Sequence, residues 1–173
     1  MALDVVIRPA RAEDEHEILE LHRSAWSRVS EPGPKRPRDA AVFDERHPVE
    51  SFLVAEDGRR VVGYIAQAPA SPLASNRHVR HIQGLAVLES TRGSGIGQAL
   101  VEAACAAARA GGARRMTLRV LGHNGPAQRL YRRCGFAVVG VLPEEFLLDG
   151  AYVDDVWMSR SLSDGHGHGP AQA

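Results

Sequence analysis

Glycines at alternate positions follow an apolar run near the middle of the chain. Residues 85–88 are apolar, and Arg92, Gly93, Gly95 and Gly97 come next, ahead of an alanine-rich segment. Because glycine has no Cβ, successive backbone N–H groups can converge there on one anion, and a helix that begins there adds the positive end of its dipole. The planar guanidinium of Arg92 suits a phosphate. These residues predict a strand, a phosphate-sized loop and a helix.

Two other kinds of glycine loop make demands that this sequence does not meet. A P-loop needs a lysine followed by serine or threonine directly after its second glycine, and no lysine occurs in this region. A dinucleotide-binding fold needs an acidic residue about 20 positions further on to bind the ribose, whereas residues 103–143 contain no Asp or Glu. Both alternatives are therefore disfavoured.

A second motif lies downstream of the glycine loop. Its members are Asn124, Ala127, Leu130, Tyr131, Gly135 and Phe136, spaced as Asn-x-x-Ala-x-x-Leu-Tyr-x-x-x-Gly-Phe. With the upstream pattern Arg-x-x-Gly-x-Gly, and with a helix and a strand between the two, it resembles the GCN5-related N-acetyltransferase (GNAT) superfamily over roughly residues 4–160. The resemblance implies an α/β (α+β) fold, in which about four helices flank a mixed sheet of about seven strands with two central strands splayed apart.

The resemblance also implies a reaction. The protein is expected to be an acetyl-CoA-dependent N-acetyltransferase, in which a primary amine attacks the thioester directly in a ternary complex. The loop would bind the pyrophosphate, and the splayed strand would pair with the pantetheine arm and polarise the acetyl carbonyl. The residues expected to bind the cofactor are Leu85, Ala86, Val87, Arg92, Gly93, Ser94, Gly95, Ile96, Gly97 and Asn124.

Tyr131 is the expected general acid. It matches the position whose phenol, in many members of the superfamily, lies near the sulfur and protonates it as the product leaves. A phenol pKa of about 10 lies close to that of the departing thiol, so the proton transfer is chemically reasonable. Without the rest of the motif, the same residue would be interpreted as a buried helix tyrosine four positions after Ala127.

The general base is less well defined by the sequence. Relatives carry a glutamate at one of two positions, which are occupied here by Arg119 and His81. His81 is the first candidate, because a histidine titrates near neutral pH and the period of two in a strand places it on the same face as Leu85. Glu89, His123 and ordered water stay open as alternatives.

The net charge of zero hides an uneven distribution. Residues 58–143 carry 12 basic and 2 acidic side chains, while the segments on either side carry an excess of acid. A basic middle fits a polyanionic cofactor such as coenzyme A, and by charge alone it would also fit nucleic acid. No aromatic residues interleave the arginines as a base-stacking surface requires, so no nucleic acid partner is expected. A cofactor-binding regulatory domain without turnover is a further alternative.

The acidic segments flank the predicted pocket, so the acceptor is expected to be a small cationic or amino-acid-like primary amine. Acetylation of a protein N-terminus, as in the ribosomal-protein acetyltransferases, is the alternative.

Residues 30–38 hold three prolines and a glycine and therefore form a loop. In the superfamily this connection lines the acceptor pocket, which makes residues 26–38 candidates for specificity. A homodimer is common among relatives.

The remaining patterns predict the order of elements along one domain, residues 1–162. Helices are expected at residues 13–29, 39–46, 96–110 and 124–135, and strands at residues 5–9, 51–55, 60–66, 79–88, 115–121, 136–148 and 152–158. The glycine-rich end, residues 163–173, is expected to be disordered. Its two histidines are too few for a metal site, and no metal is expected.

Composition narrows the class of protein. The chain is 44% apolar and 24% charged, which is typical of a globular domain. It contains no apolar run long enough to span a bilayer and no secretory-signal pattern, and its two cysteines do not form a disulfide framework. A cytoplasmic protein without a membrane partner is therefore expected.

Overall fold

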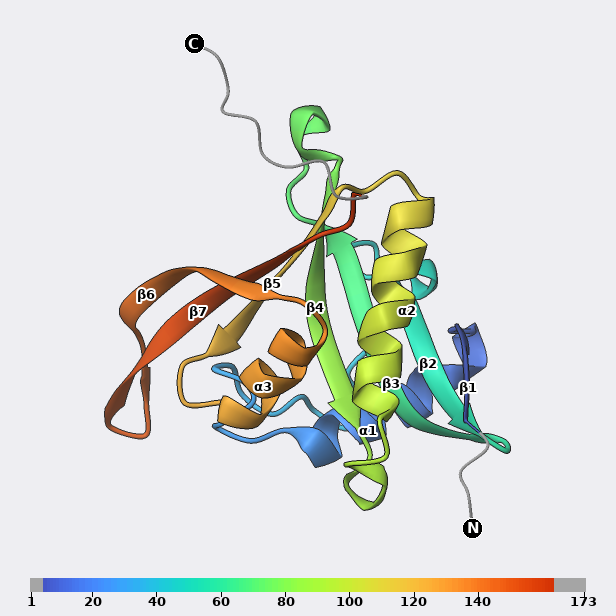
Figure 1. The fold of residues 1–173 in the computed structure, drawn as a ribbon. Coiled ribbons are helices and arrows are strands. Elements are labelled where there is room, and N and C mark those ends of the chain that lie inside the picture. The colour runs from blue at the N-terminus through green and yellow to red at the C-terminus, as the bar shows by residue number, and fades with distance from the viewer. Residues whose placement is uncertain (1–4, 164–173) are drawn as a thin grey trace.

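A computed structural model describes residues 5–163, and the predicted tail from residue 164 onward lies outside them (Figure 1). These residues form a seven-stranded sheet of order β1-β2-β3-β4-β5-β7-β6, in which β4 and β5 run parallel and all other neighbours antiparallel. The strands are β1 (Val5–Pro9), β2 (Phe52–Asp57), β3 (Arg60–Pro69), β4 (Val79–Val87), β5 (Arg115–Leu121), β6 (Ala137–Leu148) and β7 (Ala151–Ser161). The predicted mixed sheet of seven strands is confirmed.

Helices cover both faces of this sheet. The α-helices of the described part are α1 (Glu15–Ala25), α2 (Ile96–Ala110) and α3 (Gly125–Arg133). Ile18 and Leu21 of α1 are buried with Phe52 and Val54 of β2 in one core cluster, whereas α2 and α3 belong to a second cluster on the opposite face. The sheet therefore separates α1 from the other two helices.

The prediction of a short helix at residues 39–46 is wrong, because the described part of the chain has three α-helices rather than about four. The carboxylate of Glu15 accepts hydrogen bonds from the backbone N–H groups of Val42 (2.9 Å) and Phe43 (3.1 Å). The side chain of Asp44 accepts another from the N–H of His47 (2.7 Å). Side chains thus occupy backbone donors that a helix would need, and this competition favours turns.

The first helix is also shorter than expected, because α1 ends at Ala25 and not at residue 29. Trp26 is extended, with φ −62° and ψ 133°. The hydroxyl of Ser30 then accepts a hydrogen bond from the N–H of Ser27 (2.8 Å), and the N–H of Ser30 donates to the carbonyl of Ser27 (3.0 Å). This local turn starts the loop four residues earlier than the sequence predicts.

The two central strands diverge as the sequence predicts. Residues 79–82 of β4 pair with residues 115–118 of β5, and the ladder between them ends there, although β4 continues to Val87 and β5 to Leu121. Past that point the facing edges of β4 and β5 no longer form hydrogen bonds with each other. Backbone groups along residues 83–87 are therefore available on this side to a ligand that lies between the strands.

A β-bulge interrupts the other edge of β4. The ladder with β3 passes from the pair Ala66–Gly84 to the pair Gln67–Ile82, so Gln83 has no partner. Because the bulge inserts one extra residue, the alternation of side chains between the two faces of the sheet is shifted by one position across it. Ile82 accordingly shares a core cluster with Leu85. The expectation that His81 shares the face of Leu85 is therefore wrong.

Candidate active site

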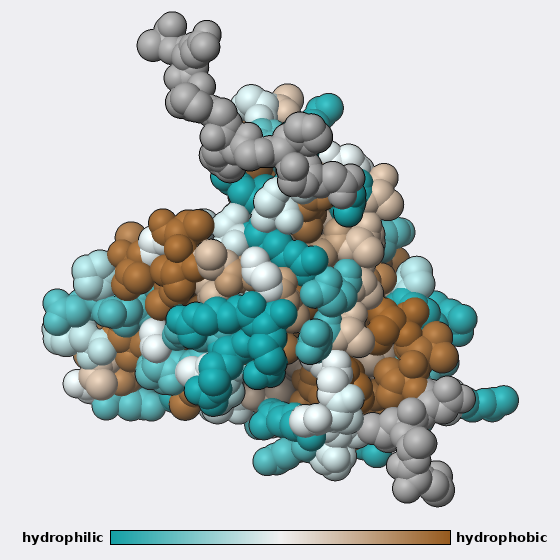
Figure 2. All heavy atoms as spheres, viewed as in Figure 1, coloured by the Kyte–Doolittle hydropathy of each residue, from teal (hydrophilic) through white to brown (hydrophobic). Residues whose placement is uncertain are grey.

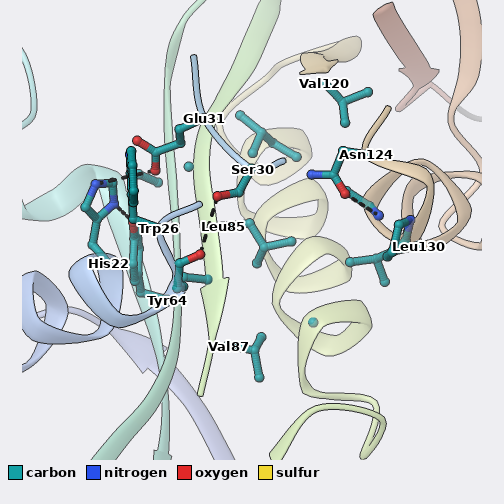
Figure 3. A pocket seen from close by; sticks show the side chains of 18 of the residues that line it. His22, Trp26, Ser30, Glu31, Tyr64, Leu85, Val87, Val120, Asn124 and Leu130 are labelled. Atoms are coloured by element: carbon teal, nitrogen blue, oxygen red, sulfur yellow. Dashed lines mark hydrogen bonds and ion pairs between the residues drawn. The ribbon is translucent and has the colours of Figure 1, made fainter. Parts of the chain in front are cut away.

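A cavity of about 1110 Å³ lies where β4 and β5 diverge. Its walls come from α1 and the loop after it, from β3 and the second half of β4, and from the glycine loop and α3 (Figure 3). Most of the residues assigned from the sequence line it, namely Leu85, Ala86, Val87, Arg92, Gly93, Gly95, Ile96, Gly97, Asn124 and Tyr131. Ser94 and His81 do not belong to the lining.

The glycine loop closes one end of this cavity. Gly93 and Gly95 have φ of 83° and 88°, in the left-handed region that favours glycine. Gly95 is the N-cap of α2, so the unpaired N–H groups of the first helical turn lie at the cavity wall. The hydroxyl of Ser94 donates to the carbonyl of Thr91 (2.6 Å) and holds the loop in place. This end has the donors and the dipole that a phosphate group needs.

Apolar side chains line the middle of the cavity. Figure 3 shows Leu85 and Val87 on the side of β4 that faces Leu130 of α3, with Val120 of β5 further along the same space. Polar contacts from this region to a ligand must then come mainly from the backbone of β4, whose edge is unpaired here. An apolar channel beside a free strand edge fits an extended arm that carries amide groups.

The second motif starts α3 at the cavity wall. The side-chain oxygen of Asn124 accepts a hydrogen bond from the N–H of Ala127 (3.2 Å) and so caps the helix, as the sequence predicts. Tyr131, about two helical turns after Asn124, is only 8% exposed and packs edge-on against Phe136. Burial raises the pKa of the Tyr131 phenol above its ordinary value, so the group keeps its proton at neutral pH.

The candidates for the general base lie in different places. Nδ1 of His81 lies 2.9 Å from the hydroxyl of Thr117, outside the cavity, and burial lowers its pKa. Nε2 of His123 lies 2.9 Å from the carbonyl of Arg28 and is also outside the cavity. Glu89 does line the cavity, next to the glycine loop. Geometry thus supports neither histidine, and the base role of His81 stays a prediction.

Arg119 occupies one of the positions where relatives carry a glutamate. It lines the cavity, forms an ion pair with the buried carboxylate of Asp155, and its guanidinium lies 5.0 Å from the ring centroid of Trp157. A guanidinium carries only hydrogen-bond donors and so offers no acceptor for a proton. The sequence predicts that position 119 supplies no general base, and the contacts of Arg119 agree with this prediction.

Three polar residues lie at the other end of the cavity, and the sequence did not single out two of them. His22 of α1, Glu31 of the following loop and Tyr64 of β3 all line it. Glu31 falls within the predicted specificity loop, but nothing in the spacing pointed to the other two. His22 and Tyr64 are 42 positions apart in the chain, so only the packing of α1 on the sheet brings them together.

Comparisons with known proteins identify the family. The profile of the Acetyltransferase (GNAT) family matches residues 15–136. An "N-alpha-acetyltransferase" of Sulfurisphaera tokodaii is 31% identical over 151 residues, which is 83% of this chain and 86% of that protein. The structure of smu.2055 from Streptococcus mutans is similar with a TM-score of 0.83 at 29% identity, covering 91% of this chain and 99% of that one. The chain therefore belongs to the GNAT family of acetyltransferases.

A further solved structure supports the fold. It is yncA from Salmonella typhimurium, determined with its cofactor acetyl-CoA, with a TM-score of 0.78 at 22% identity over 98% of this chain and 99% of that one. Family membership makes the protein an acetyl-CoA-dependent N-acetyltransferase, as the two motifs predicted. Within residues 5–163, no helix has the length and apolar character to cross a bilayer, and no three potential metal ligands come together.

Proposed function

We propose that the protein transfers the acetyl group of acetyl-CoA to the amino group of a small, amino-acid-like amine. One observation carries this proposal: a single cavity joins the glycine loop at one end to a carboxylate and a guanidinium at the other. The first end fits the phosphates of the donor, and the second fits the charges of the acceptor.

The donor half of the cavity supplies the groups that acetyl transfer requires. Gly93, Gly95 and the N-terminus of α2 would hold the pyrophosphate, with Arg92 at the rim, and residues 85–87 would pair with the pantetheine arm. In the reaction the neutral amine nitrogen attacks the acetyl carbon and loses one proton to solvent as the amide forms, while the carbon–sulfur bond breaks. Tyr131 then gives its proton to the departing thiolate and regains one from solvent.

The acceptor half supports an amino-acid-like substrate. Glu31 and Arg36 lie on the loop after α1 and both line the cavity. A carboxylate suits the ammonium of an amino acid, and a guanidinium suits its carboxylate. Trp26, whose indole N–H donates to the carbonyl of Gly33 (3.1 Å), fixes the loop that carries them. An amine with only a positive charge would leave Arg36 without a ligand partner.

Acetylation of a protein N-terminus is the second candidate function. The 31% identity to the "N-alpha-acetyltransferase" favours it, because the acceptor in both proteins would then be an α-amino group. A peptide has no carboxylate beside its α-amino group, so it would not use Arg36 in the way a free amino acid does. The two candidates therefore differ in the part of the substrate that contacts this residue.

Thiol release from acetyl-CoA, measured against a panel of free amino acids and of tripeptides with the same first residue, tests the proposal. Turnover with a free amino acid that falls when its carboxylate is amidated supports the amino-acid-like acceptor. Turnover confined to tripeptides contradicts that acceptor and favours the protein N-terminus. Acetyl-CoA binding without release on any member of the panel contradicts both candidates.

We also propose that the protein acts as a homodimer in the cytoplasm. Figure 2 shows an apolar patch over the end of the molecule formed by β6. Val139 and Leu147 of β6 are 64% and 61% exposed, and β6 is the last strand of the sheet. An apolar edge strand of this kind is suited to pairing with a second copy. Cys105 and Cys134 are free and buried thiols, which fits a reducing compartment.

A further inference from the structure

Three polar side chains from three separate elements meet at the acceptor end of the cavity (Figure 3). Nδ1 of His22 lies 2.8 Å from the phenol oxygen of Tyr64, and Nε2 of the same ring lies 3.4 Å from Oε1 of Glu31. Tyr64 is 5% exposed and the side chain of His22 13%, whereas the side chain of Glu31 is 35% exposed. The imidazole thus bridges a buried phenol and a carboxylate that faces the cavity.

Burial determines where the protons of this cluster lie. It raises the pKa of Tyr64, so the phenol stays protonated and donates its hydrogen bond to Nδ1 of His22. It also lowers the pKa of His22 to about 4, so the ring is neutral near pH 7 and its own proton is on Nε2. This nitrogen lies 3.4 Å from Oε1 of Glu31, and no hydrogen bond satisfies it within the described part of the chain.

The phenol oxygen of Tyr64 lies beside the strand edge that faces the donor. A Cβ built at Gly84 would lie 3.5 Å from this oxygen, in ordinary van der Waals contact, so the phenol oxygen is adjacent to this part of β4. Tyr64 pairs in register with Ala86 of β4, at the level where β4 has already separated from β5. Because its proton is directed to His22, the oxygen presents lone pairs to a donor in the cavity.

We propose that Glu31 and Tyr64 bind the amino group of the acceptor and that His22 positions both of them. This assignment rests on the proposed N-acetyltransferase function and specifies how the amine is held. Glu31 pairs with the ammonium and takes one proton from it, which leaves a neutral nitrogen with a lone pair. A remaining N–H donates to the oxygen of Tyr64, and the lone pair is then free to attack the acetyl carbon.

The charges around Glu31 are consistent with both tasks. Burial raises the pKa of its carboxyl group and so makes the carboxylate a stronger base. Arg36 on the same loop opposes that rise and favours the ionised form. The other titratable members of the cluster are His22 on α1 and Tyr64 on β3. Tyr131 on α3 acts on Tyr64 across the cavity, Arg36 acts on His22, and His47 also lines the cavity. Glu31 is therefore the group of this cluster that carries negative charge at neutral pH.

The test compares kcat and KM, separately for the amine and for acetyl-CoA, in the wild type and in Tyr64→Phe. The amine is the best substrate from a panel of α-amino acids and short peptides. We expect kcat/KM for the amine to fall about tenfold or more, because the variant leaves a polar group of the substrate unpaired. The KM for acetyl-CoA should stay within about twofold. Tyr152→Phe, which changes a 67% exposed phenol outside the cavity, is the matched control.

Two substitutions of His22 separate positioning from packing. In His22→Asn the amide oxygen can accept the hydrogen bond of Tyr64 near the place of Nδ1, so most of the activity should remain. In His22→Leu nothing accepts it, and we expect a loss as large as in Tyr64→Phe. Melting temperatures and calorimetric binding of acetyl-CoA show whether each variant is folded and still holds the donor.

The outcomes distinguish this assignment from the function on which it rests. Tyr64→Phe with an unchanged kcat/KM for the amine overturns the assignment, and so do equal losses in His22→Asn and His22→Leu, which indicate packing alone. A wild-type protein that binds acetyl-CoA but releases no thiol with any amine overturns the proposed function itself.

Discussion

Nε2 of His22 and Oε1 of Glu31 lie 3.4 Å apart at the acceptor end of the cavity, yet burial acts on the two groups in opposite directions. It raises the pKa of the Glu31 carboxyl and lowers that of the His22 imidazole to about 4. Desolvation disfavours the charged form of each group, which is negative for the acid and positive for the base. At neutral pH the pair is therefore a carboxylate beside a neutral ring.

The pH dependence of catalysis should reflect Glu31. Its carboxyl must be ionised to bind an ammonium, so kcat/KM for the amine should fall as the pH drops through the raised pKa, at a midpoint above the ordinary 4.5. Glu31→Gln should remove this acidic limb and lower kcat/KM about tenfold at pH 8. Rate profiles from pH 5 to 9 measure both effects, and Glu45→Gln on the exposed loop is the control. A limb that survives in Glu31→Gln would assign it to another group, such as Glu89.

The stability of the fold should depend on His22 in acid. Its folded pKa of about 4 lies below the ordinary 6.5, so the unfolded chain binds a proton first as the pH falls. The stability that His22 contributes is thus present above pH 6.5 and is lost as the pH drops from 6.5 to about 4. We expect His22→Asn to flatten the decline of the melting temperature in this window. His16→Asn, on the exposed face of α1, should keep the wild-type slope.

Tyr131→Phe tests the general acid. The phenol lines the cavity and remains protonated because burial raises its pKa, so it can donate throughout the usual assay range. We expect kcat to fall at least about tenfold, while binding of acetyl-CoA measured by calorimetry changes little. The ring itself is kept, so its edge-on packing with Phe136 persists and the fold should be unaffected. Unchanged turnover would remove Tyr131 from the acid role.

Most of the residues that the sequence proposes for donor binding line the cavity, and they could be found from the sequence because they are close together in the chain. Gly93 and Gly95 directly precede α2, Gly97 lies in its first turn, and Asn124 caps the helix that carries Tyr131. In both motifs one short stretch determines the local backbone and also supplies residues that line the cavity. Such a stretch needs no knowledge of tertiary packing to be interpreted.

The acceptor half could not be predicted in the same way. His22 and Tyr64 meet only because α1 packs on β3, and no short-range spacing encodes that contact. The bulge at Gln83 is equally hidden, and it reversed the face that a strict period of two assigns to His81. Glu15 likewise turns residues 39–46 away from a helix through contacts with a distant segment. Each of these differences arises from long-range packing that overrides local pattern.

The glycine loop should be sensitive at Gly95. Its φ of 88° is costly for any residue with a Cβ, although nothing within 4 Å would clash with one. We expect Gly95→Ala to lower stability by about 1 kcal/mol and to weaken acetyl-CoA binding about tenfold, because the first turn of α2 must shift. Calorimetry and thermal melts measure the two effects. Gly140→Ala is the matched control, since that glycine has open space and no left-handed φ. Wild-type affinity in Gly95→Ala would show that the loop does not hold the donor.

The exposed edge of β6 should control the oligomeric state. Val139 and Leu147 are large apolar residues that water contacts over most of their surface, and β6 has a neighbour in the sheet on one side, β7. Burying such an edge against a second copy satisfies its backbone groups and removes apolar area from water. We expect the wild type to have twice the mass of one chain in light scattering, and Val139→Lys with Leu147→Lys to have the mass of a single chain. Val6→Lys places the same charge at a 56% exposed valine on β1, at the opposite edge of the sheet, and should leave the dimer intact. A monomeric wild type, or a dimer that also dissociates in Val6→Lys, would contradict the assignment of the interface to β6.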